Sequence, residues 1–415
     1  MSKSLLPEDW VVVILGFIII GVSLGGFLLA APEYGWSSTA DLTGKVLTAD
    51  NLLKIVFQFA YVVIIAVLGA LLTGKSVAGV VKAFPAVYIL TIIALIIAGS
   101  SQMKALNLEA VIFSLGIGLL IGNFFKLPTW FKEALASEFY VKIGLVLLGT
   151  SIIFADILKA GSLGLIQALV VVLSVWYFSF WLCRKLKIDP ELSMMLSSAV
   201  SICGVSAAIA TSGAIKGDSK KLSLVISLVL ITAVPMMVFM PYIAKLLGLS
   251  QEVTGAWLGG SIDTTGAVVA SGSLVGETAL KISSIVKFSQ NVLLGVAAFA
   301  ISVYWTYTKH PSAKDADTKP TLKVIWERFP KFVIGFVAAS LLFSFFTSAN
   351  ASTAVKGPLK NLQGLWFALA FTSIGLETNF RDLVNKDSRR PIYAFLTAQG
   401  FNILVTLAIA YVLFK

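Results

Sequence analysis

The chain has 415 residues, of which 58% are hydrophobic and 13% are charged, whereas a soluble globular domain carries about 25% charged residues. This composition excludes a protein whose only solvent is water, and the long apolar runs exclude an outer-membrane barrel, whose segments of about 10 residues alternate in polarity. The formal net charge of +11 would fit nucleic-acid binding, but the distribution of the charges along the chain argues against that role.

Long apolar runs recur along the whole chain, and those at 11–31, 52–72 and 162–182 reach the roughly 20 residues that a helix needs to cross the membrane. The first run is too long for the apolar core of a signal peptide, so we expect it to be retained as a helix. We therefore predict an all-α polytopic membrane protein of about 13 spans. The expected spans lie near residues 11–31, 52–73, 81–99, 109–125, 141–157, 162–183, 193–214, 222–246, 256–273, 281–307, 331–348, 361–378 and 391–414.

Basic residues separate the loops between these spans into two sets. The richer set holds Lys3, Lys75, Lys82, Lys126, Lys132, Arg184, Lys185, Lys187, Lys309, Lys314, Lys319, Lys323, Arg328, Lys331, Arg381, Lys386, Arg389 and Arg390. By the positive-inside rule this side is cytoplasmic, which places the N-terminus inside and the C-terminus outside a bacterial inner membrane. Lys216, Lys220 and Lys221 fall on the other side in this count, so one boundary near them is misplaced. The basicity reports topology, and we expect no nucleic-acid partner.

Residues 140–185 and 364–414 resemble each other. Each stretch has Gly, Thr and Ser close together, then Phe154 and Asp156 or Phe380 and Asp382, and then a long apolar helix. The copies lie seven expected spans apart, and an odd number gives them opposite orientations, as in the inverted repeats of secondary transporters. The alternative is chance similarity between apolar helices. We expect residues 1–107, outside the repeat, to form a scaffold or an oligomer contact such as a homodimer, and residues 108–415 to form the transport core.

Two of the expected spans are unsuited to regular helices. Residues 201–208 read Ser-Ile-Cys-Gly-Val-Ser-Ala-Ala, and residues 259–266 read Gly-Gly-Ser-Ile-Asp-Thr-Thr-Gly. Glycine disfavours a helix by about 1 kcal/mol relative to alanine, and Ser and Thr side chains compete for the backbone. Unwound backbone at membrane depth is tolerated only where protein, water or a ligand satisfies it. We predict two broken crossing helices that form a binding site; the alternative is close packing of helices through small residues.

Two charged residues lie deep in the expected spans. Asp263 is at the centre of one, where an ionisable group is costly and usually lines a functional cavity. Lys287 either extends to an interface or pairs with Asp263 or an anionic substrate. Glu377 and Arg381, at i,i+4 spacing, are expected to form an ion pair. The candidate substrate-binding residues are Ser201, Cys203, Gly204, Ser206, Gly260, Ser261, Asp263, Thr264, Thr265 and Lys287.

The sequence offers little for catalysis. Cys183 and Cys203 lack metal-ligand spacing, and the single histidine, His310, lies in a charged loop. No nucleophile–histidine pair and no nucleotide-binding motif is present. We therefore expect no enzyme, no metal, no cofactor and no ATP-driven pump.

Five motifs carry a resemblance to a known family. They are Leu-Gly-x-x-Ile at 148–152, the 201–208 segment, Gly-x-x-Ile-Asp-x-x-x-x-Val-Val-Ala-x-Gly at 259–272, Val-Lys-Phe-Ser-Gln-Asn-Val-Leu-Leu at 286–294 and Ser-Ile-Gly-Leu-Glu-Thr at 373–378. The chain resembles the YeiH-like sulfate exporter family of bacterial inner-membrane proteins. The resemblance implies the architecture of the cation/proton-antiporter and anion-transporter group, in which two discontinuous helices cross at mid-membrane in a core that moves against a scaffold.

These observations favour a secondary transporter of a small anion, with sulfate as a candidate, that works by elevator-like alternating access. Broken helices turn N-terminal amides toward the midplane, where their dipoles suit an oxyanion. The alternative is a cation/proton exchanger in which Asp263 is the coupled carboxylate, and a channel is a third hypothesis.

Overall fold

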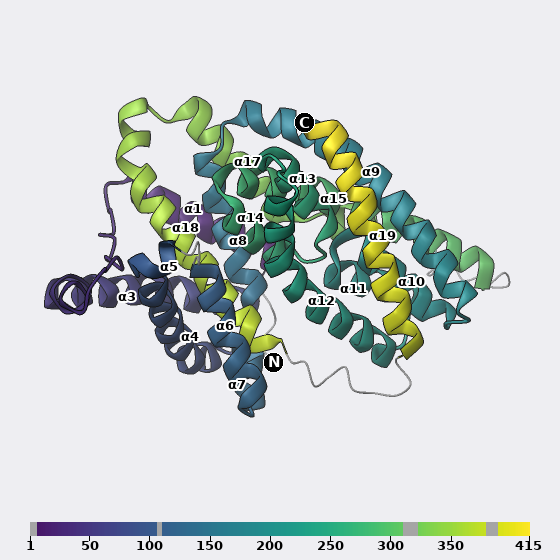
Figure 1. Cartoon of the computed structure of the whole chain (residues 1–415), viewed down its shortest axis with the longest axis horizontal. Coiled ribbons are helices and arrows are strands. Elements are labelled where there is room, and N and C mark those ends of the chain that lie inside the picture. The colour runs from purple at the N-terminus through teal and green to yellow at the C-terminus, as the bar shows by residue number, and fades with distance from the viewer. Residues whose placement is uncertain (1–5, 106–109, 310–322, 379–388) are drawn as a thin grey trace. The chain divides into compact units, whose positions relative to one another are not determined.

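The computed structural model describes residues 6–105, 110–309, 323–378 and 389–415, and these are helical almost throughout (Figure 1). In this part of the chain, seven helices are long and apolar enough to cross a membrane. They are Ala49–Thr73, Val77–Ala98, Thr129–Ser151, Phe154–Lys185, Ser219–Leu246, Glu277–Trp305 and Arg389–Phe414. The predicted class, an all-α multi-pass membrane protein, is confirmed.

The chain divides into two compact units. Unit 1 comprises Met1–Ala155 and Lys331–Asn379, and unit 2 comprises Asp156–Pro330 and Phe380–Lys415. In the expected repeat, Phe154 and Asp156 match Phe380 and Asp382. The unit boundaries at 155–156 and 379–380 fall next to these matching residues. The inverted repeat itself stays a prediction. The functional division expected at 107–108 also stays a prediction, because the two units are defined by how the chain packs and their boundaries lie elsewhere.

Unit 1 is a bundle of apolar helices. The elements are α1 (Glu8–Leu24), α2 (Thr39–Asp41), η1 (Leu42–Val46), α3 (Ala49–Thr73), α4 (Val77–Ala98), α5 (Ser101–Ala105), α6 (Ala110–Phe124), α7 (Thr129–Ala134), α8 (Ser137–Leu148), η2 (Gly149–Ser151), α17 (Lys331–Leu341), η5 (Leu342–Phe346) and α18 (Ala349–Glu377). The backbones of α6 and α18 nearly touch, since a Cβ added at Gly122 would lie 2.8 Å from the carbonyl oxygen of Leu376. Small residues at such contacts are how apolar helices pack closely within a membrane.

Unit 2 holds the segments that the sequence marks as broken. Its elements are α9 (Phe154–Lys185, from its third residue onward), α10 (Pro190–Ser198), η3 (Ala199–Cys203), α11 (Val205–Ile215), α12 (Ser219–Leu246), α13 (Gln251–Ser261), α14 (Thr265–Val275), α15 (Glu277–Lys309), α16 (Lys323–Arg328) and α19 (Arg389–Phe414). α10 begins where the side chain of Asp189 caps it, accepting hydrogen bonds from the amides of Glu191 and Leu192. Pro190 follows at the first helical position, where proline is well tolerated.

The first broken segment folds back on itself instead of crossing. At the start of α12, Lys221 Nζ lies 2.7 Å from Asp189 Oδ1 and 3.0 Å from Glu191 Oε2, both at the start of α10. The amide of Asp218 also donates to Glu191. Residues 190–215 therefore form a hairpin, called hairpin 1 below, whose two ends lie together. This corrects the expected span 193–214 and places Lys216, Lys220 and Lys221 on the side of Arg184 and Lys185.

The second broken segment is also a hairpin. A Cβ added at Gly276, just after α14, would lie 2.7 Å from Gln251 Oε1 at the start of α13. Residues 251–275, called hairpin 2, thus begin and end at one place. Between the two hairpins runs α12, which has 28 residues and is about 42 Å long. The hairpins enter from opposite ends of α12. Three of the four arms, α11, α13 and α14, have 11 residues each and cover about 16 Å, half the thickness of the hydrocarbon. The fourth consists of α10, with 9 residues, and η3, with 5.

The expectation of two crossing helices is therefore wrong in its connectivity, and two of the roughly 13 expected spans are re-entrant hairpins. A helix that breaks at its centre leaves polar backbone groups there, and these are satisfied only if other protein groups enclose the break. The two hairpins meet this requirement because their tips touch each other and side chains of α15 and α19 bond to the carbonyls at both breaks. The predicted parity of the topology is unchanged, because removing two spans leaves an odd number of expected spans, for which the ends of the chain are expected on opposite sides.

Candidate functional site

The tips of the two hairpins are in contact. The tip of hairpin 1 is Gly204, with φ +64 and ψ −111, a backbone conformation that residues other than glycine rarely adopt. The tip of hairpin 2 is the extended stretch from Ile262 to Thr264. A Cβ added at Gly204 would lie 2.6 Å from Val229 Cγ1 and 3.1 Å from Asp263 Cβ. Glycine is needed here for its backbone conformation and for this close approach.

The arms that lead to the tips, α10 with η3 in hairpin 1 and α13 in hairpin 2, are called the inward-running arms. Their last carbonyls accept hydrogen bonds from side chains that bridge the two hairpins. Lys287 Nζ donates to the carbonyls of Ile202 (2.8 Å) and Ile262 (2.9 Å). Gln290 Nε2 donates to those of Ser201 (2.8 Å) and Gly260 (3.3 Å). Asn402 Nδ2 donates to those of Val200 (3.1 Å) and Ser261 (3.2 Å). Three side chains thus join residues 200–202 of hairpin 1 to residues 260–262 of hairpin 2.

These capping groups come from two helices, each with its donors one turn apart. α15 supplies Lys287 and Gln290, and α19 supplies Asn402 and also Gln399, whose Nε2 donates to the carbonyl of Ser261 at 2.8 Å. Sequence reasoning missed the roles of Gln399 and Asn402. Two amides three residues apart in an otherwise apolar helix were the available signal, because polar side chains in membrane helices generally bond across helices.

The arms that lead away from the tips, α11 in hairpin 1 and α14 in hairpin 2, are called the outward-running arms. The N-terminal end of each lies at the tip. The N-terminal end of a helix presents unpaired amide N–H groups and a partial positive charge. α11 has no side-chain cap, while the Oγ1 of Thr264 accepts from the amide of Ala267 in α14. Ser206 is exposed and Thr264 and Thr265 are half-buried, whereas Ser201 and Ser261 are buried. The accessible face of the site therefore consists of helix N-termini and hydroxyl groups.

Asp263 and Lys287 are fully buried but are not paired with each other. Their exposed fractions are 2% and 1%, and among the described residues no ion pair within 4.0 Å joins them. Asp263 Oδ2 has no hydrogen-bond partner. Of the alternatives left open for Lys287, a direct ion pair with Asp263 is therefore absent: Lys287 lies at the negative ends of the inward-running arms, and Asp263 lies at the positive ends of the outward-running arms.

Comparison with known proteins places this architecture in a family. A family model described as "Conserved hypothetical protein 698" matches residues 82–394, which include both hairpins and α15. The chain belongs to the UPF0324 family of membrane proteins. It is 41% identical to a UPF0324 membrane protein of Rhodopirellula baltica over 325 residues, which are 76% of this chain and 59% of the relative.

Other relatives bear the same family name. A UPF0324 membrane protein of Nitratidesulfovibrio vulgaris is 40% identical over 326 residues, 76% of this chain and 56% of the relative. One of Nitrosomonas europaea is 31% identical over 318 residues, 68% of this chain and 64% of the relative. This chain thus spans 56–64% of the length of these three relatives. No solved structure matches it.

Within this UPF0324 chain, several predicted site residues contribute to packing. Gly260 faces Gln167, with no room for a Cβ, and Cys203 lies in an apolar cluster with Ala207 and Leu294. The hydroxyl of Ser201 donates within its own helix, to the carbonyl of Ser197 at 2.7 Å. Of the ten predicted residues, Ser206, Thr264 and Thr265 are at least partly exposed at the tips, whereas Asp263 and Lys287 are buried there. Their role in binding a substrate stays a prediction.

Close packing through small residues, the alternative explanation of these segments, also applies in part. Gly255 and Gly259 lie one turn apart on α13, and a Cβ at Gly255 would lie 2.8 Å from the carbonyl oxygen of Ala279 in α15. These two glycines allow hairpin 2 to lie directly against α15. That contact brings Lys287 to the tips, so the packing glycines and the tip residues serve one arrangement.

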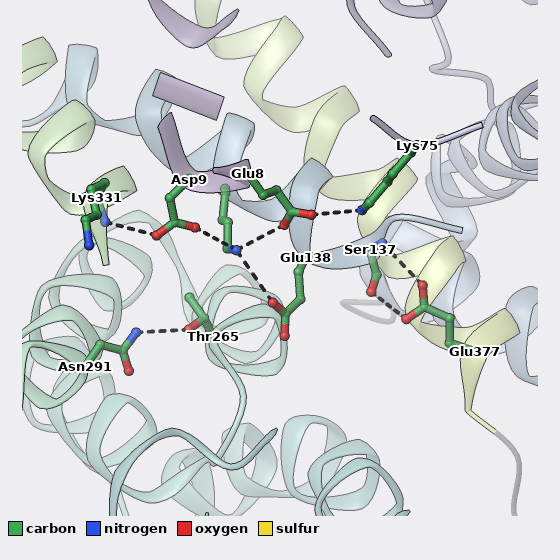
Figure 2. A network of polar contacts seen from close by, with 10 residues as sticks. Glu8, Asp9, Lys75, Ser137, Glu138, Thr265, Asn291, Lys331 and Glu377 are labelled. Carbon is green, nitrogen blue, oxygen red and sulfur yellow. Dashed lines mark hydrogen bonds and ion pairs between the residues drawn. The ribbon is translucent and has the colours of Figure 1, made fainter. Parts of the chain in front are cut away.

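Polar contacts in both units appear in Figure 2. In unit 1, the carboxylates of Glu8 and Asp9 in α1 pair with Lys142 of α8 at 3.2 and 2.9 Å. The carboxylate of Glu377 accepts from the hydroxyl of Ser137 at 2.6 Å and from its amide at 3.3 Å, capping α8. The expected pairing of Glu377 with Arg381 lies outside the described residues. In unit 2, Asn291 Nδ2 donates to Thr265 Oγ1 at 3.2 Å.

Proposed function

We propose that the chain is a secondary transporter of a small anion, with sulfate export as the candidate activity, and that it works by elevator-like alternating access. The observation that carries the proposal is the meeting of two re-entrant hairpins that enter from opposite ends of α12. Such paired half-helices, with binding groups near the midplane, are how many secondary transporters build a substrate site.

The chemistry of the accessible face favours an anion. The carbonyl ends of both inward-running arms are buried and capped by amide and ammonium donors. The groups left for a ligand are therefore the amides at the start of α11 and α14 and the hydroxyls of Ser206, Thr264 and Thr265. All of these can donate hydrogen bonds to an oxyanion, and the helix dipoles favour its charge.

The division of the chain supports alternating access. Both hairpins and all the side chains that cap them belong to unit 2, and unit 1 contributes none of them. An elevator mechanism requires one unit that carries the whole site and another that does not. In this proposal unit 2 is the carrier and unit 1 includes the scaffold. A homodimer in the inner membrane stays a prediction that accompanies this assignment.

A cation/proton exchanger is the second candidate, and one observation favours it. Asp263 Oδ2 is buried at the tips with no hydrogen-bond partner, and a carboxylate buried at membrane depth is a natural carrier of a proton. In that case the anion would be absent and Asp263 alone would couple two cation fluxes.

Purified protein in liposomes separates these candidates. We would supply sulfate, sulfite, a dicarboxylate, Na⁺ and a pH gradient in turn and follow the flux of each species. Saturable anion flux that needs no Na⁺ supports the proposal. Exchange of Na⁺ for protons with no dependence on any anion would replace it with the second candidate, and flux that does not saturate would indicate a channel.

A further inference from the structure

The ammonium group of Lys287 lies in a cage of oxygen atoms at the meeting point of the two tips. Its Nζ contacts the carbonyl oxygen of Ile202 at 2.8 Å, that of Ile262 at 2.9 Å and Gln290 Oε1 at 2.9 Å. The side chain is 1% exposed. All three partners can only accept hydrogen bonds, which determines what Lys287 must supply.

The orientation of the Gln290 amide follows from its other contacts. Its nitrogen is occupied by the carbonyls of Ser201 and Gly260, so its oxygen is the atom that faces Lys287. A neutral amine has two N–H groups, whereas an ammonium has three. Three acceptors at hydrogen-bond distance therefore require Lys287 to carry its positive charge in this arrangement.

A cage of carbonyl oxygens at the C-terminal ends of two half-helices is also what a free cation would need. In transporters with broken helices, unwound carbonyls and half-helix C-terminal ends coordinate Na⁺, and rings of carbonyls can replace the hydration shell of K⁺. Here the ammonium of Lys287 already fills that place. Its charge opposes the partial negative charge of both helix ends.

We propose that Lys287 is a tethered cation that replaces a free monovalent cation at the hairpin tips. Two consequences follow. The tips stay joined in either a Na⁺-containing or a Na⁺-free solution, and removal of the side chain creates a new binding site for a small cation. The new cation site in a variant without the side chain is a property of the fold alone. The independence of the tips from Na⁺ rests on the proposed function only where it is measured as Na⁺-independent transport.

The test uses thermal unfolding of the full-length protein in detergent. Lys287→Ala is compared with the wild type in chloride salts of Na⁺, K⁺, methylammonium and the bulky N-methylglucamine at equal ionic strength. We expect the variant to unfold at a lower temperature than the wild type in N-methylglucamine. A small cation at about 100 times its dissociation constant should raise the variant's midpoint by about 3–5 °C and leave the wild type unchanged.

Lys281→Ala is the matched control. Lys281 lies on the same helix and pairs with Glu277 at 3.4 Å near the start of α15, so its removal opens no cage and should give no cation-specific gain. A Lys287→Ala protein that folds but responds equally to all four salts would overturn the proposal, because its carbonyls would then accept water instead.

If Lys287→Ala cannot be purified in a folded state, thermal unfolding of the wild type tests the proposal. Its unfolding midpoint should be the same in Na⁺, K⁺ and N-methylglucamine chloride. A saturable stabilisation by Na⁺ alone would mean that a free cation binds in addition to Lys287, and would overturn it. Since these readouts are temperatures, failure of the transport proposal would leave them unaffected and would be seen only in the liposome flux.

Discussion

Gly204 and Asp263 lie in contact although 58 residues separate them in the chain: a Cβ on Gly204 would be 3.1 Å from the Cβ of Asp263. Gly204 occupies the N-cap position of α11, and Asp263 immediately precedes Thr264, whose side chain caps α14. The contact therefore brings two helix N-termini together beside a buried acidic residue. The negative charge of Asp263 would repel an anion that binds these N-termini.

Replacing Gly204 by leucine should abolish transport while the protein still inserts in the membrane. The substitution forces a side chain into contact with Val229 and Asp263 and into a backbone conformation that costs about 1–3 kcal/mol. Gly248→Leu is the control, because Gly248 also has φ +64 but nothing lies within 4 Å of an added Cβ. Flux is measured in liposomes with equal amounts of inserted protein. Equal flux in the two variants would contradict a role for the tip contact.

Replacing Asp263 by asparagine should strengthen anion binding about tenfold, which corresponds to about 1.4 kcal/mol. The amide is close in shape, and the competing negative charge at the two N-termini is gone. Calorimetric titration with the anion found in the flux panel measures this change. Weaker binding in Asp263→Asn, together with transport that no longer responds to a pH gradient, would instead support a proton-carrying role for Asp263.

Replacing Lys142 by methionine should destabilise unit 1 by about 1–3 kcal/mol, because it removes the ammonium group that Glu8 and Asp9 share. Glu8 keeps its ion pair with Lys75 at 2.8 Å, so most of the loss should come from Asp9. The Lys142 side chain is 16% exposed, and those of Glu8 and Asp9 are 30% and 23% exposed. Unfolding in denaturant measures the change. Lys45→Met is the control, since Lys45 is exposed and pairs only locally with Asp41; a matching loss in both variants would rule out the shared-partner explanation.

Replacing Asp189 by asparagine should remove a contribution to stability that depends on pH. Burial raises the pKa of Asp189, but the hydrogen bond from Lys221, together with the amides of Leu192 and Glu191 and the charge of Lys221, lowers it further, so the pKa lies below the usual range. A lowered pKa stabilises the folded state above the unfolded-state pKa of about 3.9 and loses that effect as pH falls through the folded-state pKa.

The unfolding midpoints of wild type and Asp189→Asn should accordingly differ by a constant amount between about pH 5 and 7 and converge toward about pH 3. Asparagine still caps α10 well, so the difference reports mainly the ion pair with Lys221. Because the Asp189 side chain is 44% exposed, solvent screening keeps the effect small. A difference that widens as the pH falls would contradict this account.

The sequence by itself determined the helical membrane class and the two places where helices break. Apolar runs of about 20 residues leave the backbone no alternative to helices in hydrocarbon. Gly204 and the Ser261–Thr265 stretch disfavour a continuous helix through local propensity alone. These properties depend on residues close in the chain, so they can be predicted without knowing where the chain goes next.

Only the tertiary structure decided that each broken segment turns back. A hairpin and a crossing helix have the same local pattern, and the choice depends on contacts such as Lys221 with Asp189, 32 residues apart. The only indication of the hairpin in the sequence was that the basic residues at 216–221 fell on the wrong side of the membrane in the count of spans. The caps from Gln399 and Asn402 reach residues more than 130 positions away. Periodicity carries no information about such distances, because it records which face of a helix is apolar and not which helix it meets.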